Sequence, residues 1–532
     1  MDKPTLSTDN SSVKRSAEKL PENDEKKPKT TGFVFKPSGE QQSKSIFDSA
    51  PMKTPVAATT NFPTTFKFGV GKNAVTMSVP APVKKEPVVM KEDADSDCMK
   101  YESDEDEHGT VPEQDYSEDE KCEDVMEGRV FITSSDCITA RTPISKDSKT
   151  YDVYVFGSGD CGQLGLDMDV TQAGKPIKHV KATDLKTTRI VSGGLFNVIV
   201  TNDNKLYSWG CNDESQLGRE GEELHPLPVN VGELPKDDPI DQIAAGACHV
   251  VILTLSGKVY CWGTYRDSKG ILGWNETVQK QLNPTQIHFP RGVIITSISC
   301  GENHSLALAK DGIVYGWGCD EQGQLMFHMP EAMKRRALVP HALSFREGRR
   351  RMRARAIWAG GMHSMVLLEN GHLMTFGLNN WGQLGNGRRS ETVEAPERIT
   401  FFDDKEVVQA ALSQHATAVL TKDGCVYTCG RNSYGQLGRM NEDQQFDIHF
   451  AKVSFPEDVR IQQIACGNHH VLAVDEKGLL YTWGFGDMEQ LGNGKYEDET
   501  HPYHVKSKEL SNKRVVMVDG GAQHSVLLAE MF

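Results

Sequence analysis

The pentapeptide VYCWG at residues 259–263 joins an apolar, strand-forming stretch to a glycine, and closely similar segments recur along the chain. They are VYVFG (153–157), LYSWG (206–210), VYGWG (314–318), LMTFG (373–377), VYTCG (426–430) and LYTWG (480–484). Their final glycines are 53 to 59 residues apart. A period of this length indicates a repeated supersecondary unit. We therefore expect one domain built from seven similar units.

Each unit contains signals for four short strands. An alternating stretch such as IDQIAA (240–245) comes first, and a glycine-histidine segment such as SCGENHSLALA (299–309) follows. An Asp-Gly step, as in KDGIVYGWG (310–318), predicts a tight hairpin into the third strand. A short apolar run after each QLG supplies the fourth. Four strands in each of seven units predict an all-β fold, a seven-bladed β-propeller of four-stranded blades.

The two ends of the repeat region complement each other. The first unit begins at VYVFG and lacks a preceding glycine-histidine strand, whereas the last unit ends with GGAQHSVLLAEMF (520–532) and lacks a following VYxWG strand. We expect the N- and C-terminal strands to complete one blade together. A ring closed in this way leaves no free sheet edge.

The region before the repeats has a different composition. Residues 1–127 lack apolar periodicity, which predicts a long disordered N-terminal tail, followed by a linker at 128–149 and the propeller at 150–532. Within the tail, residues 92–127 contain 17 acidic residues and two lysines, a net charge of −15. The whole chain also has a net charge of −15, so the remainder is close to neutral.

Other compositional features narrow the setting. There is no apolar run of 18 residues and no secretory signal, so no membrane partner is expected. The twelve cysteines include no CxxC pair, which favours a reduced intracellular compartment. No metal or cofactor site is predicted.

One repeat is longer than the others. In WGCNDESQLG (209–218), six residues separate the first glycine from the leucine, but in WGTYRDSKGILG (262–273) there are eight. The longer span contains Arg266, Asp267, Ser268, Lys269 and Gly270, residues that suit an exposed hairpin tip. The alternative is a tolerated loop extension, because lengthening a loop costs little free energy.

In a four-stranded meander, the first and third connections lie at the same end of the blade. The insert 266–270 should therefore share one face with polar residues from the other units. These are Asp160, Asp213, Asn303, Asp320, His415 and His524. Acids, amides and histidines without a nucleophile–base pair or a phosphate-binding loop favour a protein-docking surface over an enzyme active site. The other recurrent histidines, His249, His304, His363 and His470, are expected to link blades.

The seven units resemble the regulator of chromosome condensation repeat family across residues 150–532, and WGTYRDSKGILG is the specific match. The resemblance implies guanine nucleotide exchange on the small GTPase Ran without covalent chemistry, with the insert acting as a β-wedge against the nucleotide site of nucleotide-free Ran. It also implies that Asp160, His415 and His524 contact Ran. Ala247, Asn303 and Phe327 depart from the expected family residues, which leaves Glu302 and Lys334 as candidate substitutes.

Two basic clusters have a different expected role. The first, in FREGRRRMRARAI (345–357), includes Arg349, Arg350, Arg351 and Arg353 and should lie on the face opposite the insert. The second, in AMKRRALVP (332–340), includes Lys334, Arg335 and Arg336. Against a near-neutral body they predict phosphate-contacting patches, with a solvated loop as the alternative. The resemblance implies that the first contacts the DNA backbone, without sequence specificity, and the second the acidic patch of the histones in a nucleosome.

The start of the tail, VKRSAEKLPENDEKKPK (13–29), has a bipartite nuclear-import pattern. Its basic residues are Lys14, Arg15, Lys26, Lys27 and Lys29. A flexible basic tail can match this pattern by chance; taken as a signal, it predicts importin binding and a nuclear location.

These observations together predict a chromatin-bound exchange factor for Ran that generates Ran-GTP for nuclear transport and for spindle and nuclear envelope assembly. The alternative is a chromatin-binding propeller scaffold without exchange activity. A ligase or kinase would need a second catalytic domain, and residues 1–127 cannot fold into one.

Overall fold

The computed structural model describes residues 147–532, except 168, 222, 232–233, 236 and 440–443. The predicted tail at 1–127, its import signal and most of the predicted linker lie outside the described residues. Those assignments stay predictions.

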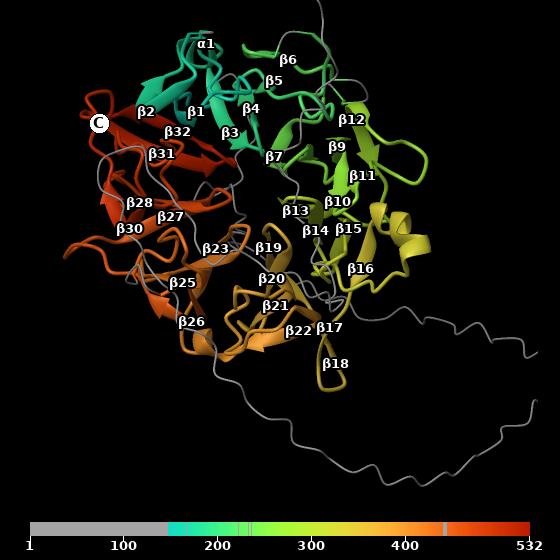
Figure 1. The fold of residues 1–532 in the computed structure, drawn as a ribbon. Coiled ribbons are helices and arrows are strands. Elements are labelled where there is room, and N and C mark those ends of the chain that lie inside the picture. Colours follow the sequence, from blue (N-terminus) through green and yellow to red (C-terminus); the bar gives the residue numbers. More distant parts are fainter. Residues whose placement is uncertain (1–146, 168, 222, 232–233, 236, 440–443) are drawn as a thin grey trace, which may run out of the picture. The chain divides into compact units, whose positions relative to one another are not determined.

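The described residues form seven four-stranded antiparallel sheets and two separate two-stranded hairpins. The sheets follow one another around a ring (Figure 1). Each is a meander, and its first strand lines the ring's axis, where residues such as Val191, Ala244, Ala411 and Ala465 surround a central cavity. The predicted seven-bladed propeller of four-stranded blades is confirmed.

Six blades are built from continuous segments of the chain, and in each the strands follow one another from the axis outward. The first three are β3 (Thr187–Ser192), β4 (Phe196–Thr201), β5 (Leu206–Gly210) and β6 (Leu227–Pro228); β7 (Ile240–Ala245), β8 (His249–Thr254), β9 (Val259–Gly263) and β12 (Gln281–Ile287); and β13 (Ile295–Cys300), β14 (His304–Ala309), β15 (Val314–Gly318) and β16 (His341–Leu343). The next three are β19 (Ala354–Ala359), β20 (His363–Leu368), β21 (Leu373–Leu378) and β22 (Thr392–Ile399); β23 (Val407–Leu412), β24 (Ala416–Thr421), β25 (Val426–Arg431) and β26 (Phe446–Lys452); and β27 (Ile461–Cys466), β28 (His470–Asp475), β29 (Leu480–Gly484) and β30 (Glu499–His504).

The seventh blade joins the two ends of the ring. It consists of β31 (Lys513–Gly520), β32 (His524–Met531), β1 (Asp152–Ser158) and β2 (Gln172–Lys178). The register between β1 and β32 runs from Asp152 opposite Ala529 to Gly157 opposite His524. The predicted closure by N- and C-terminal strands is confirmed.

Helical structure is confined to short connections in the described region. These are α1 (Val180–Asp184) and the 3₁₀ segments η1 (Glu331–Leu338) and η2 (Thr400–Phe402). None of these helices is long and apolar enough to cross a membrane.

The hydrophobic core lies between blades, because each middle strand is covered on both sides. The second strands are buried along their whole length, as in β8 and β14. Trp209, Trp262, Trp317 and Trp483, from the recurrent third-strand motif, are fully buried. The glycine that ends this motif is required by close packing. At Gly263 the φ angle is +92°, and a Cβ atom would lie 2.2 Å from the carbonyl oxygen of Cys248.

A buried polar link joins neighbouring blades at the start of the second strand. The Nε2 atom of His304 lies 2.9 Å from the Ser364 hydroxyl of the next blade, and that hydroxyl donates to the carbonyl of Gln324, 2.9 Å away. Because a serine hydroxyl has one hydrogen, His304 must be the donor to Ser364. The proton on Nε2 is therefore fixed, and burial, which lowers the pKa of His304 to about 3, keeps the ring neutral.

The same link recurs around the ring. His363 bonds Thr417 at 2.8 Å, and His470 bonds Ser525 at 2.8 Å; each hydroxyl donates to a glutamine carbonyl of the preceding blade. His249 bonds Ser305 at 3.0 Å. The predicted linking role of these histidines is confirmed.

His524 belongs to the same set. Its Nε2 atom lies 2.9 Å from Oδ1 of Asn197 across the junction that closes the ring, and its side chain has no exposed surface. The prediction that His524 lies on the docking rim is wrong, because the ring closure buries it.

These buried histidines predict a pH-dependent stability. Burial lowers the pKa of His249, His304, His363, His470 and His524 to about 3, whereas an unfolded histidine has a pKa of ~6.5. Between these values the unfolded chain binds more protons, so stability must fall as pH falls below 6.5. Each histidine contributes a slope of ~1.4 kcal/mol per pH unit.

Urea unfolding at pH 7 and pH 5.5 measures this effect. We expect a large loss of unfolding free energy at pH 5.5, and a smaller loss in His363→Gln, which lacks one titrating group. Equal stability at the two pH values would contradict the neutral, buried links.

Candidate functional site

The long third repeat forms a two-stranded hairpin between β9 and β12. Its strands are β10 (Tyr265–Asp267) and β11 (Gly270–Gly273), which pair with Asp267 opposite Gly270. Ser268 and Lys269 are exposed at the tip, and Gly270 has a φ of +120° with open space around it. The predicted hairpin is confirmed, and we call residues 265–273 the wedge hairpin.

The wedge hairpin lies at the end of the blades that we call the upper face. This face carries the turns between first and second strands, such as 301–303, and the loops between third and fourth strands, such as 319–340. The opposite ends form the lower face, with the hairpin turns such as 310–313 and the connections between blades such as 344–353.

The base of the wedge hairpin is part of a blade-to-blade link. Tyr265 is fully buried, its hydroxyl lies 3.0 Å from Ser305 Oγ, and its ring lies 4.3 Å from the ring of His249. In the links of His304, His363 and His470, a glutamine carbonyl bonds the hydroxyl of the next blade. Here the tyrosine hydroxyl takes that place, so the insert is built into the ring.

The strands of the wedge hairpin are held from both neighbouring blades. The backbone N–H of Arg266 donates to Asn303 Oδ1 at 2.9 Å, and its guanidinium pairs with Glu214 at 2.6 Å. The Asp267 carboxylate pairs with Lys334 of η1 at 2.5 Å. Glu214 belongs to the preceding blade, whereas Asn303 and Lys334 belong to the following one.

The tip is fixed by further contacts. Ser268 donates from its backbone N–H and its hydroxyl to Glu321, at 2.8 and 2.9 Å, and Lys269 pairs with Glu331 at 2.5 Å. Burial opposes the charge of Lys334, but Asp267 and Glu331 together raise its pKa. The ammonium is therefore present at neutral pH.

These contacts change two sequence-based expectations. Arg266 and Asp267, expected at an exposed hairpin tip, are paired within the chain and hold the strands of the hairpin. Lys334, expected in a chromatin-binding cluster with Arg335 and Arg336, lies beside the wedge hairpin, because η1 is part of an upper-face loop. Arg335 donates to the carbonyl of Glu276, 3.2 Å away, on the same face.

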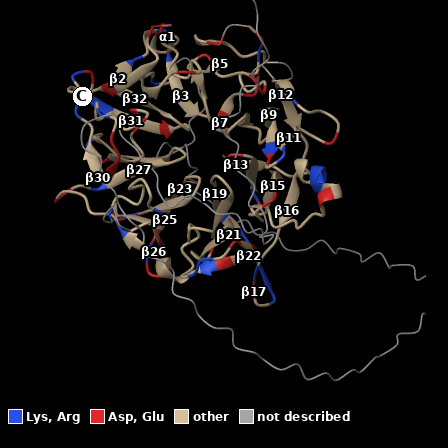
Figure 2. Ribbon diagram, viewed as in Figure 1, with Lys and Arg blue, Asp and Glu red and all other residues tan. Residues whose placement is uncertain are grey.

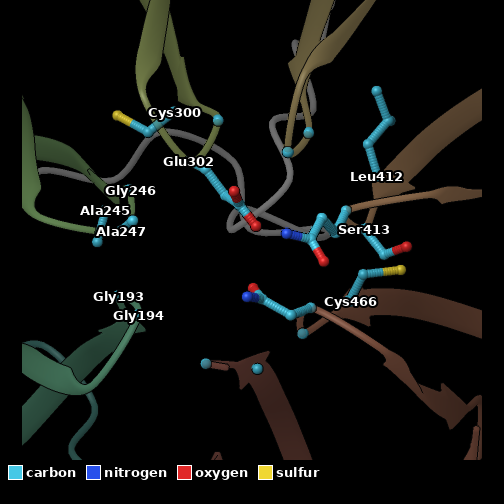
Figure 3. A pocket seen from close by; sticks show the side chains of 18 of the residues that line it. Gly193, Gly194, Ala245, Gly246, Ala247, Cys300, Glu302, Leu412, Ser413 and Cys466 are labelled. Carbon is cyan, nitrogen blue, oxygen red and sulfur yellow. The ribbon is translucent and has the colours of Figure 1, made fainter. Parts of the chain in front are cut away.

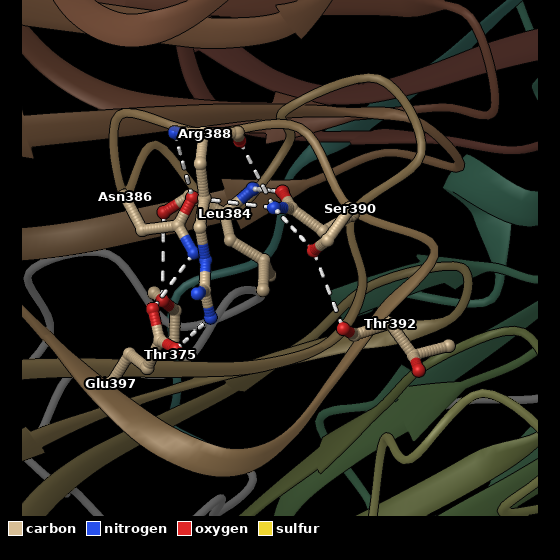
Figure 4. Close-up of polar contacts among 8 residues, drawn as sticks. Thr375, Leu384, Asn386, Arg388, Ser390, Thr392 and Glu397 are labelled. Atoms are coloured by element: carbon tan, nitrogen blue, oxygen red, sulfur yellow. Dashed lines mark hydrogen bonds and ion pairs between the residues drawn. The ribbon is translucent and has the colours of Figure 1, made fainter. Parts of the chain in front are cut away.

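An asparagine or aspartate shapes most of the other upper-face loops. Asn379 Oδ1 accepts from the backbone of Leu384 at 3.1 Å, while its Nδ2 donates to Asn386, Arg388 and Ser390. These four partners are labelled in Figure 4. Asp320 occupies the same place and accepts from the backbones of Leu325 and Phe327.

Asp320 is therefore a structural residue of its loop. Burial raises the pKa of its carboxyl. Asp320 lies in an upper-face loop, as expected, but its carboxylate is engaged by the backbone of that loop. In the wedge blade the corresponding residue, two positions after the strand-ending glycine, is Tyr265, which is buried at the base of the wedge hairpin. Without the loop-shaping carboxylate or amide, this span can form a hairpin.

Exposed acids occupy one repeated position on the upper face. Three residues after the strand-ending glycine, the loops carry Asp160, Asp213, Glu321 and Asp487, and all four are exposed. Asp160 and Asp213 lie on this face as expected, whereas Glu321 and Asp487 were missed. Aligning the seven repeats on their glycines would have found them.

A second group, which we call the aromatic–arginine cluster, lies across the loops of two consecutive blades. Arg389 stacks on Trp381 and Phe446, at 5.1 and 4.9 Å, and Arg431 stacks on Trp381 and Tyr434, at 4.9 and 5.0 Å. Phe446 is 37% exposed. Sequence reasoning missed this cluster, because its members come from separate repeats.

The mouth of the central cavity lies at the centre of the upper face. Glycine-containing turns of successive blades surround it, and the Glu302 side chain points across it (Figure 3). Burial raises the pKa of Glu302 to about 7, partly offset by a hydrogen bond with Gln414. His415 lies nearby, its ring stacked 6.5 Å from that of His469, and burial lowers its pKa to about 3. Among the described residues no cluster of side chains is arranged to hold a metal ion.

The first basic cluster forms a hairpin on the lower face. Its strands are β17 (Phe345–Glu347) and β18 (Arg350–Met352), in the connection between two blades. Arg353 lies 3.7 Å from Asp311, and Glu347 pairs with His372; both partners belong to lower-face turns. We call residues 345–353 the arginine hairpin. Figure 2 shows basic residues gathered on it. Its expected place opposite the wedge hairpin is confirmed by these contacts.

Comparison with known proteins identifies the class of propeller. The family described as "RCC1-like domain" matches residues 152–527. The human "Regulator of chromosome condensation" is 33% identical over 394 residues, which cover 71% of this chain and 90% of the human protein. The chain therefore belongs to the regulator of chromosome condensation family.

Two yeast proteins extend the comparison. "Guanine nucleotide exchange factor SRM1" of Saccharomyces cerevisiae is 26% identical over 424 residues, covering 70% of this chain and 86% of that protein. The crystal structure of Prp20p from Saccharomyces cerevisiae, a protein described with its binding to Gsp1p and histones, superposes with a TM-score of 0.69. It is 25% identical and covers 74% of this chain and 96% of Prp20p.

The contacts of Asn303 predict its effect on the wedge hairpin. Asn303→Ala removes the acceptor of the Arg266 N–H, so hydrogen exchange of the 265–273 segment should accelerate by about tenfold, for a lost hydrogen bond of ~1 kcal/mol or slightly more. Mass spectrometry of peptides covering 265–273 and 363–368 measures this. The second peptide serves as the reference and should not change. Unchanged exchange in the first would contradict the anchoring role.

Proposed function

We propose that this protein promotes GDP/GTP exchange on the small GTPase Ran while it is bound to chromatin. The observation that carries the proposal is the wedge hairpin, which is held rigidly by both neighbouring blades and presents Ser268, Lys269 and Gly270 at its tip. The name of the yeast relative, a guanine nucleotide exchange factor, supports the same activity.

The mechanism follows from thermodynamic linkage. An exchange factor that binds nucleotide-free GTPase better than the nucleotide-bound form must weaken nucleotide binding by the same factor. The tip does this by occupying space that the phosphate-binding segment of the GTPase needs when nucleotide is bound. Because the hairpin is already ordered, little of its binding energy is lost to ordering it on docking. Exchange of this kind makes and breaks no covalent bond in the exchange factor.

The rest of the upper face supplies docking contacts. The exposed acids at Asp160, Asp213, Glu321 and Asp487 attract a basic partner surface and speed its association. The aromatic–arginine cluster has the residue types that dominate binding energy at protein interfaces. Glu302 and His415 contribute near the axis, whereas Arg266, Asp267 and Asn303 hold the wedge hairpin in position. His524, which is buried, acts only through ring closure.

Chromatin binding uses other residues. Arg349, Arg350 and Arg351 of the arginine hairpin are exposed and suited to phosphate contacts that carry no sequence information. Lys334, Arg335 and Arg336 of η1 are proposed to meet acidic histone surface, and the histone binding described for Prp20p supports this. Contacts at η1 would be felt at the wedge hairpin through the Lys334–Asp267 pair.

The tail completes the proposal. Its basic residues at Lys14, Arg15, Lys26, Lys27 and Lys29 are proposed to bind importins and bring the protein to the nucleus. Ran-GTP produced at chromatin would then serve nuclear transport and the assembly of the spindle and nuclear envelope.

Nucleotide release from Ran tests the exchange activity. Wild-type protein should accelerate release of a fluorescent GDP, and Arg266→Ala/Asp267→Ala should lose at least about tenfold, because two charge-assisted bonds that hold the wedge hairpin are removed. The matched control is Glu406→Ala/Lys422→Ala, which removes an exposed ion pair of the lower face and should have no effect. Release no faster than in buffer would leave the scaffold alternative.

The two faces should separate in function. Arg349→Glu/Arg350→Glu/Arg351→Glu should weaken nucleosome binding strongly and lower its salt dependence, because three phosphate contacts contribute ~2.7 to the slope of log affinity against log salt. Exchange on free Ran should stay unchanged. Equal damage to both activities would contradict the assignment of these phosphate contacts to the lower face and of exchange to the upper face.

A further inference from the structure

The arginine hairpin carries a concentrated positive charge that is only partly balanced. Residues 345–353 contain five arginines and one glutamate, a net charge of +4. Arg346, Arg349, Arg350 and Arg351 are exposed and have no acidic partner among the described residues, and Arg353 has only the 3.7 Å contact with Asp311. Like charges this close repel one another, so the hairpin favours a polyanion as its ligand.

The chain itself contains such a polyanion. Residues 92–127, outside the described region, hold a net charge of −15, and the longest acidic run there is Asp104, Glu105, Asp106 and Glu107. Outside this segment the chain sums to about zero charge, so this segment is the largest concentration of negative charge that the arginine hairpin can meet within one molecule.

The chain enters the ring on the face that carries the arginine hairpin. Asp152 begins β1 opposite Ala529, at the lower end of the closing blade, and Lys149 pairs with Glu530 beside it. The described chain therefore begins at the lower face, at residue 147. The wedge hairpin lies at the other ends of the blades.

The segment that connects the acidic residues to the propeller is long enough for them to reach the arginine hairpin. The 19 residues at 128–146 can span up to ~60 Å when extended. A compact domain of about 380 residues has a radius of gyration of ~21 Å, so its diameter is less than this reach. A segment tethered in this way is present at an effective concentration on the order of millimolar, far above that of a free ligand in a typical assay.

From these observations we propose that the acidic segment 92–127 docks on the arginine hairpin of the same molecule and competes there with nucleic-acid phosphates. The docked segment acts as a competing polyanion within the same molecule. It suppresses weak binding to isolated duplex DNA and is displaced only where other contacts add to the affinity. The contact is electrostatic, so it weakens as salt rises.

Chemical modification of arginine tests the contact without any nucleic acid. Full-length wild type is compared with D104N/E105Q/D106N/E107Q/E118Q/D119N/E120Q, which keeps the tail length but removes seven charges. With phenylglyoxal at ~50 mM salt, Arg349, Arg350 and Arg351 should react at least about threefold faster in the neutralised variant. Arg389, exposed on the upper face, is the internal reference and should react equally in both. Equal rates at the arginine hairpin would overturn the proposal.

A double-mutant cycle tests the competition, and this second experiment rests on the proposed phosphate binding. Affinity for a 30-base-pair duplex is measured by fluorescence anisotropy for wild type, the neutralised tail, R349A/R350A/R351A and the combination. Neutralising the tail should tighten binding about tenfold with the native hairpin and have no effect without it. An equal gain in both backgrounds would mean general repulsion of DNA by the tail and would overturn the competition. If wild type and the neutralised tail both fail to bind DNA, the proposed phosphate binding fails, and the modification rates still decide whether the contact exists.

Discussion

The structure depends on a polar link between blades, in which a buried, neutral histidine donates to a hydroxyl of the next blade and that hydroxyl donates to a glutamine carbonyl. The chain of donors fixes the histidine proton on Nε2, and burial keeps the ring neutral. The link sets the spacing of the blades at the end where the docking loops leave. At the wedge hairpin the glutamine carbonyl is replaced by the hydroxyl of Tyr265, so the inserted residues are held by the same device that holds the ring.

This arrangement explains how a short hairpin can act as a rigid element. Isolated two-stranded hairpins are marginally stable in water. In this protein a buried tyrosine holds the base, Asn303 and Glu214 hold one strand, and the Asp267–Lys334 pair joins it to the following blade. The side chains that resemble partner contacts in sequence are therefore largely occupied within the protein. The exposed surface of the tip, the other exposed acids Asp160, Asp213 and Asp487, and the aromatic–arginine cluster are left for the partner.

Much of this could be predicted from the sequence, because the repeats report on one another. The period and the incomplete end units predicted the ring and its closure, and the eight-residue span predicted the wedge hairpin. Local motifs could not tell which polar residue turns inward. His524 has the same local pattern as the linking histidines, and only the closing junction with Asn197 shows that it is buried. Asp320 aligns with Asn212, Asn379 and Asn432, and that equivalence would have revealed its structural role. The position of Lys334 beside the wedge hairpin depends on the path of η1, and the pattern of the repeats does not predict that path.

A structure of the protein bound to nucleotide-free Ran tests the central claim most directly. The account predicts that residues 265–273 keep the position they have in the free protein, with Ser268, Lys269 and Gly270 against the segment of the GTPase that would hold the phosphates. A complex in which this hairpin is refolded, or lies away from the nucleotide site, would contradict it.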